Sequence, residues 1–145
     1  MQVDSRAHAV WQGTLAEGSG EATLATGVGG SLPVSWPSRT ETAAGKTSPE
    51  ELIAAAHAAC YSMALSAGLG RAGFTPTKLE TDATASFEKT EPGWRLTRMA
   101  LRVVGDVPGI DQAAFITAAT AAKDSCPVSS ALKGNVEITV EAALA

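Results

Sequence analysis

The chain has 145 residues, of which 45% are hydrophobic and 18% charged, enough to build one globular domain over residues 1–145. Its formal net charge of −4 comes without a basic run, which argues against nucleic acid as a partner. The N-terminal MQVDSRAHAV has no apolar signal segment, and no window approaches about 18 uninterrupted apolar residues, the length of a membrane span. We therefore expect a cytoplasmic protein without a membrane partner.

The first forty residues contain short segments of alternating polarity, separated by breaks rich in glycine and serine. Alternation with period two is typical of strands that expose one face, and glycine-rich breaks are typical of turns. These segments predict the strands of an antiparallel meander: AHAVWQGTL, GEATLATG and SLPVSWPSRT.

A long helix is predicted to follow. Ser48 and Glu51 have the spacing of a capping box, and Pro49 occupies the first helical position, so the helix begins there and runs to about Arg71. It is apolar almost all round, which predicts a buried central helix. The stripe expected to be buried consists of Leu52, Ala56, Ala59, Cys60, Met63 and Ala67.

The remaining chain predicts a hairpin, two helices and a last strand. Asp111 is positioned to cap the first of these helices, and the second, short helix begins at Cys126 and Pro127. The order lacks regular β-α alternation, so the expected class is α+β with antiparallel sheets. The expected elements are strands at 79–88 and 94–104, helices at 111–125 and 126–134, and a strand at 136–144. Arg95, Arg98 and Arg102 are expected to pair across the hairpin with Glu80, Asp82 and Glu88.

Two cysteines carry the most chemical information in the sequence. In a cytosolic chain they indicate reactive or redox-cycling thiols more readily than a structural disulfide. Cys60 lies in the middle of the long helix, where a buried cysteine can be an inert small hydrophobe. Cys126 precedes Pro127 at a helix start, where unpaired backbone N–H groups lower a thiol pKa.

Two segments resemble the signature blocks of the OsmC/Ohr family: SPEELIAAAHAACYSMALS at 48–66 and CPVSSALKGNVEITVEAAL at 126–144. SWPSRTE at 35–41 and VPGID at 107–111 extend the resemblance, and HAACYSMAL is more similar to the OsmC branch than to Ohr. The resemblance implies an intertwined homodimer and a thiol peroxidase that reduces organic hydroperoxides. It makes Cys60 the peroxidatic and Cys126 the resolving thiol. It also suggests a dithiol such as dihydrolipoamide as reductant, and no organic cofactor or metal because sulfur does the redox work.

The same resemblance assigns two charged residues. Arg39 matches the arginine of the family's active site, although Thr40 stands where an aromatic residue is usual. A fixed cation is required because burial would otherwise oppose ionisation of the attacking thiol, and the forked donors of arginine can hold the departing peroxide oxygen. Glu50 matches the carboxylate that orients this arginine, whereas Glu51 fits the capping box.

Other readings of the same residues remain open at this point. His57 is three residues before Cys60 and can act as a general base or be a satisfied core residue. A metal site would use His8 and His57 with both cysteines, but it lacks the usual ligand spacing. A cysteine hydrolase would leave Cys126 without a role, and a non-catalytic binding module would simply bury both thiols.

Helix geometry predicts a site completed by dimerisation. Glu50 and Cys60 are ten residues apart, which corresponds to roughly 15 Å along a continuous helix. One carboxylate then does not steady an arginine beside the thiol of its own chain unless the arginine loop bends far. Antiparallel crossing of two such helices in a symmetric dimer would bring Glu50 of one subunit toward Cys60 of the other.

Overall fold

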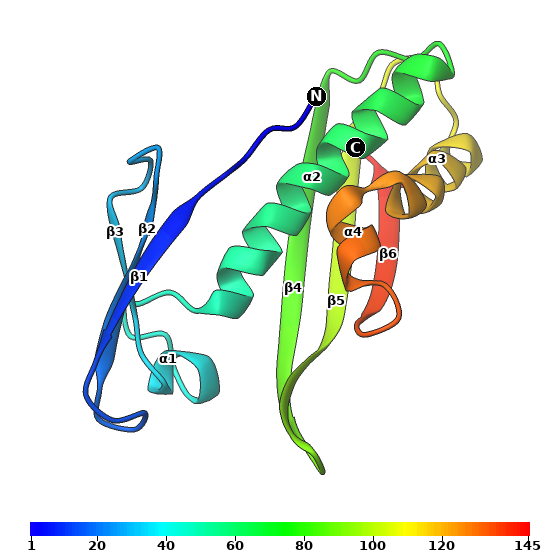
Figure 1. The fold of residues 1–145 in the computed structure, drawn as a ribbon. Coiled ribbons are helices and arrows are strands. Elements are labelled where there is room, and N and C mark those ends of the chain that lie inside the picture. The colour runs from blue at the N-terminus through cyan, green and yellow to red at the C-terminus, as the bar shows by residue number, and fades with distance from the viewer. The chain divides into compact units, whose positions relative to one another are not determined.

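A computed structural model describes all 145 residues, which form two compact units, Met1–Leu52 and Ile53–Ala145. Figure 1 traces the elements of both units along the chain. In chain order they are β1 (Ala7–Gln12), β2 (Ser19–Leu24), β3 (Ser31–Val34), α1 (Pro37–Thr40), α2 (Pro49–Arg71), β4 (Lys78–Thr90), β5 (Gly93–Asp106), α3 (Gln112–Ser125), α4 (Pro127–Leu132) and β6 (Glu137–Leu144). The α+β class is as expected.

The first unit is built on the predicted meander, with antiparallel strands in the order β1-β2-β3. The short helix α1 was not predicted. Its turn is closed by a reciprocal pair, in which the Ser35 N–H donates to Ser38 Oγ and the Ser38 N–H donates to Ser35 Oγ. Pro37 at the start of the turn favours the helical backbone that this pair holds.

The second unit contains a three-stranded sheet in the order β4-β5-β6. β4 and β5 form the predicted antiparallel hairpin, paired from Lys78 with Asp106 to Thr90 with Gly93. The expectation of antiparallel sheets is wrong for the last strand, because β6 runs parallel to β5. The two helices between these strands provide the long crossover that a parallel pair requires.

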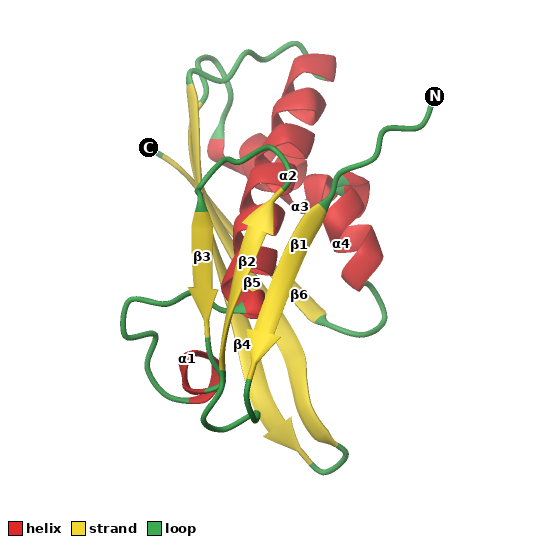
Figure 2. Ribbon diagram, turned by 60° about the vertical axis from the view of Figure 1, so that its left-hand side comes forward, coloured by secondary structure: helices red, strands yellow, loops and turns green.

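The helices of the second unit lie on one face of this sheet (Figures 1 and 2). Every second residue of β5 points into that interface, where Met99, Leu101 and Val103 are almost fully buried. All buried hydrophobic residues of the chain fall within 53–145. They are Ala54, Tyr61, Leu65, Leu69, Met99, Leu101, Val103, Val107, Phe115, Ala119, Ala122, Cys126 and Val136.

Helix α2 has the predicted bounds, but its buried face is not the predicted one. The Glu51 N–H donates to Ser48 Oγ, as a capping box requires. The stripe in the core is Ala54, His57, Tyr61, Leu65 and Leu69. Met63 of the predicted stripe is 69% exposed, and Ala56, Ala59 and Ala67 are also exposed. Both faces are apolar, so the sequence pattern did not distinguish which one meets the sheet.

Helix α2 is also long and apolar enough to cross a membrane by length and composition alone. The core helix of a soluble protein meets the same criterion, so this is weak evidence for a span.

The predicted ion pairs across the hairpin do not form. The register places Arg95 opposite Glu88 and Arg102 opposite Asp82, but the only ion pair in the hairpin joins Lys78 to Glu80. Arg95 instead donates to the side-chain oxygen of Asn135 at 2.7 Å. Exposed ion pairs contribute so little that a neutral acceptor competes with them.

Candidate active site

The two thiols come together in the second unit. Cys60 lies in the middle of α2 and is half-buried, while Cys126 is fully buried at the residue before α4. Cys126 has an extended backbone (φ −77°, ψ 119°) because α3 ends there and Pro127 begins α4. Both cysteines are free thiols, and they lie close enough for each to influence the pKa of the other. The fold therefore joins two thiols that are far apart in the sequence.

The surroundings shift the pKa values of the two thiols in opposite directions. Burial raises the pKa of Cys60, and the charge of Cys126 adds to this effect. Burial also opposes ionisation of Cys126, but hydrogen bonds from the backbone and hydroxyl of Ser129 outweigh it. Together with bonds from the Cys60 thiol and the Val128 N–H, they lower the pKa of Cys126. The surroundings therefore favour the thiol form of Cys60 and the thiolate form of Cys126 relative to ordinary cysteines.

His57 contacts the serine rather than a cysteine. Its Nε2 lies 2.7 Å from Ser129 Oγ, and both residues are buried. Burial lowers the pKa of His57, so the ring is neutral near pH 7. The other ring nitrogen, Nδ1, is buried without a hydrogen-bond partner. His57 therefore belongs to a buried contact between α2 and α4.

Tyr61 holds the third helix against this cluster. Its hydroxyl donates to the Ala119 carbonyl at 2.7 Å, which ties α2 to α3. Burial raises the pKa of Tyr61, and the charge of Cys126 adds to the shift. Tyr61 therefore stays protonated near pH 7 and serves as a fixed donor.

Arg39 and Glu50 form a two-pronged ion pair in the first unit. Arg39 Nη2 lies 2.7 Å from Glu50 Oε1, and Nε lies 3.2 Å from Oε2. The guanidinium also lies over the Trp36 ring, with Cζ 5.4 Å from the ring centroid. Bidentate pairing and stacking hold the planar cation in one orientation. The arginine side chain is still 28% exposed, so it keeps access to a ligand.

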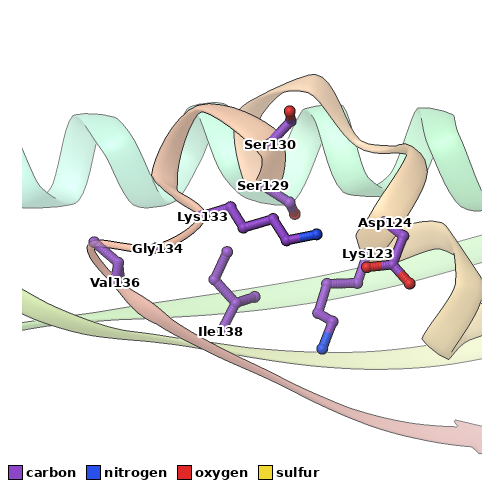
Figure 3. Close-up of a pocket in the computed structure, with 8 residues that line it drawn as sticks. All are labelled: Lys123, Asp124, Ser129, Ser130, Lys133, Gly134, Val136 and Ile138. Carbon is purple, nitrogen blue, oxygen red and sulfur yellow. The ribbon is translucent and has the colours of Figure 1, made fainter.

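A small pocket borders Ser129 in the second unit. Its volume is about 200 Å³, and Figure 3 shows Ser129 and Ser130 of α4 beside it, with their hydroxyls pointing in different directions. The remaining lining comes from the end of α3, the α4–β6 turn and β6: Lys123, Asp124, Lys133, Gly134, Val136 and Ile138.

The structure thus brings the predicted site residues together as two pairs. Cys60 and Cys126 meet in the unit Ile53–Ala145, and Arg39 and Glu50 meet in the unit Met1–Leu52. No group of three or more His, Cys, Asp or Glu side chains is arranged to hold a metal ion. The sequence reading missed Ser129, although its position three residues after Cys126 at a helix start was an available signal.

Comparison with known proteins identifies the family. The profile described as "OsmC-like protein" matches residues 42–141. Peroxiredoxin OsmC of Escherichia coli is 44% identical over 138 residues, covering 95% of this chain and 96% of that protein. Organic hydroperoxide resistance protein OhrA of Bacillus subtilis is 33% identical over 101 residues, which are 67% of each chain. The crystal structure of OhrB of Bacillus subtilis superposes with a TM-score of 0.76 at 26% identity, over 95% of this chain and 98% of that one. The chain belongs to the OsmC-like protein family.

Proposed function

We propose that this protein is a thiol peroxidase that reduces organic hydroperoxides, with Cys60 as the peroxidatic and Cys126 as the resolving cysteine. The names of its relatives, peroxiredoxin and organic hydroperoxide resistance protein, support the activity. The observation that supports the cysteine pair is that the two free thiols lie close enough for each to influence the pKa of the other. Thiols in direct contact can form a disulfide without a large rearrangement of the backbone.

The proposed reaction uses the hydroperoxide, the two cysteine sulfurs and one proton from solvent, and its atoms and electrons balance. As Cys60 attacks the terminal oxygen of the hydroperoxide, its proton passes to Cys126. The O–O bond breaks, Cys60 becomes a sulfenic acid, and the alkoxide takes a proton from solvent to leave as an alcohol. Cys126 then attacks the Cys60 sulfur, the S–O bond breaks, and the proton held by Cys126 leaves with the hydroxyl as water. A dithiol such as dihydrolipoamide returns both cysteines to the thiol state.

Arg39 and Glu50 supply the charge that this chemistry needs. Since burial raises the pKa of Cys60, a fixed cation is required to favour its thiolate during attack. Arg39 is the proposed cation, and its donors also stabilise the departing oxygen. Glu50 orients it through the bidentate contact. The forked guanidinium donors of Arg39 and the two carboxylate oxygens of Glu50 are complementary in shape and charge.

We further propose that the active form is a cytoplasmic homodimer in which residues 1–145 act as one domain and the sites are shared between subunits. Helix α2 is continuous from Pro49 to Arg71, as the argument from helical rise requires. The first unit exposes large apolar side chains and contributes none to the buried core. A high content of exposed apolar side chains is typical of an interface. The exposed face of α2, with Met63 and its neighbouring alanines, offers a second such surface.

Thiol titration tests the proposed function. The native reduced protein should present two titratable thiols, and one equivalent of cumene hydroperoxide should consume both. Mass spectrometry should then find the peptide of Cys60 linked to the peptide of Cys126 in the same chain. A hydrolase or a binding module would keep both thiols after this treatment, and that result would refute the proposal.

A further inference from the structure

We propose that His57 and Ser129 are positioning residues whose hydrogen bond holds the start of α4 against α2 and so keeps Cys126 within reach of Cys60. Neither residue takes part in the chemistry, because both act by fixing where the two sulfurs lie. This role rests on the cysteine pair of the proposed function. It does not depend on which sulfur carries the negative charge, and it can be measured without a peroxide.

Helix α4 has few buried contacts of its own to fix its position. It spans six residues, Pro127–Leu132, too few for a stable isolated helix. Its N-cap residue, Cys126, makes no side-chain hydrogen bond to the helix start. Val128 and Leu132 pack against the core but are only partly buried. Ser129 is the one buried residue of the helix, so its contact is the one fully buried attachment that an α4 side chain makes.

That contact reaches α2 at a defined point. Ser129 Oγ lies 2.7 Å from His57 Nε2, and the two residues are 3% and 0% exposed. A hydrogen bond allows a narrow range of lengths and angles, so it fixes two helices more closely than non-directional apolar contact does. Losing either partner leaves the other as a buried polar group without a hydrogen bond. The second ring nitrogen, Nδ1, has no partner, so His57 has no other hydrogen bond that could replace this one.

The contact lies one helical turn from each thiol. Cys60 follows His57 by three residues on α2. Ser129 follows Cys126 by three residues at the start of α4. Residues at this spacing are neighbours on a helix surface. The Ser130 N–H donates to the Cys126 carbonyl at 3.0 Å, so Cys126 moves together with the first turn of α4. A hydrogen bond that fixes the distance between His57 and Ser129 therefore also limits the distance between the two sulfurs.

The consequence concerns the disulfide. Two cysteines form a disulfide only within a narrow range of distances and angles. If α4 shifts or frays, Cys126 spends less time within reach of Cys60, and the effective concentration of one thiol toward the other falls. In the proposed cycle this slows the attack of Cys126 on the sulfenic acid, which then stays longer exposed to a second peroxide. The equilibrium constant for forming the disulfide should fall for the same reason.

The test brings the whole protein to equilibrium with mixtures of reduced and oxidised dithiothreitol and measures the Cys60–Cys126 disulfide by acid quench, alkylation and mass spectrometry. Ser129→Ala should lower its equilibrium constant by about tenfold. His57→Leu should lower it by a similar factor, and the double variant should lose no more than either single one, because all three lack the same contact. An unchanged constant in either single variant, or losses that multiply in the double variant, would overturn the proposal.

Ser62→Ala is the matched control. Ser62 Oγ lies 2.8 Å from Thr81 Oγ1, so this serine also makes a side-chain hydrogen bond that involves α2, but it joins α2 to β4 instead of α4. Ser62 is also closer in sequence to Cys60 than His57 is. The variant should keep the disulfide constant of the parent. A loss equal to that of Ser129→Ala would show that any weakening around α2 acts on the disulfide, and it would refute the specific role.

Conservative variants separate the hydrogen bond from the bulk of the side chain and remain available if Ser129→Ala does not fold. Ser129→Thr keeps the hydroxyl, whereas Ser129→Val has nearly the same shape without it. Threonine should hold the disulfide constant near that of the parent and valine should lower it, and equal constants would refute the proposal. His57→Gln keeps a polar nitrogen at the end of the side chain and should restore most of what His57→Leu loses.

The parent protein separates this role from the proposed function. A parent that forms no Cys60–Cys126 disulfide with oxidised dithiothreitol would refute the cysteine pair, and the role of His57 and Ser129 with it. A parent disulfide that the substitutions leave unchanged would refute only the role of His57 and Ser129.

Discussion

The two compact units surround their predicted site residues in opposite ways. In the unit Met1–Leu52, the Arg39–Glu50 pair is a partly exposed contact between full charges, oriented by a bidentate geometry and by an aromatic ring. In the unit Ile53–Ala145, Cys126 is fully buried, and hydrogen bonds alone make it the more acidic thiol. All buried apolar residues lie in the second unit, and the first unit has none.

On the proposed mechanism, the peroxidase needs both parts. A buried apolar setting excludes water from a sulfenic acid, but it also opposes the charge that sulfur must carry during attack. A cation kept near the surface retains its hydration until a ligand arrives. The proposed mechanism therefore makes the chemistry depend on both units, and each of the following experiments probes one of them.

Substituting the thiols should give the largest effect. Cys60→Ser should lower peroxidase activity by about 10⁴-fold or more, because it removes the nucleophile. Cys126→Ser should still reduce one equivalent of hydroperoxide and accumulate a sulfenic acid on Cys60, detectable by dimedone labelling and mass spectrometry. If Cys126→Ser blocks the first turnover as completely as Cys60→Ser does, the two roles are wrongly assigned.

Removing the cation should have the next largest effect. Arg39→Ala should lower kcat/KM by about 100-fold or more, since it removes the donor to the developing charge. Arg102→Ala is the matched control, because Arg102 is an exposed arginine of the β4–β5 hairpin without an ion pair. Equal losses in the two variants would remove Arg39 from the mechanism.

Mixing of variant subunits tests whether Glu50 of one subunit acts together with Cys60 of the other. Glu50→Ala and Cys60→Ser should each be nearly inactive alone. Refolded together as random dimers, they should recover about a quarter of the wild-type activity, because half of the dimers have one intact site of two. Native mass spectrometry establishes that mixed dimers are present. No recovery in such a sample would place Glu50 in the site of its own subunit or outside the mechanism.

A smaller difference is expected in how the disulfide is opened. Since Cys126 has the lowered pKa, it is the better leaving thiolate, and an external dithiol should attack Cys60. Rapid acid quenching and peptide mapping should find the mixed disulfide on Cys60. Trapping it mainly on Cys126 would contradict the charge distribution described for the pair.

The smallest effect is expected from a change that affects the fold of the second unit alone. Asp111 caps α3, with its carboxylate accepting from the Ala114 N–H at 2.8 Å. Asp111→Ala should lower the free energy of unfolding by about 1 kcal/mol in chemical denaturation. The peroxide-driven loss of thiols should proceed at the wild-type rate. A large loss of reactivity would show that the thiol pair depends on the exact placement of α3.

Local patterns were enough to predict most elements of this protein. Alternating residues predicted the meander and the β4–β5 hairpin, and Ser48, Pro49 and Asp111 predicted helix starts, because these signals arise within a few residues of one another. The family resemblance named Arg39, Glu50, Cys60 and Cys126, and the structure forms two contacting pairs from them. Their roles in catalysis remain predictions.

Only the tertiary structure decided the features that depend on packing between distant segments. Helix α2 is apolar on both faces, so the face that meets the sheet, with His57, Tyr61 and Leu65, was decided by the elements that pack on it. The parallel direction of β6 was decided by the crossover through α3 and α4. The contact of His57 with Ser129, 72 positions along the chain, has no local signal, because it forms only where α2 and α4 pack together.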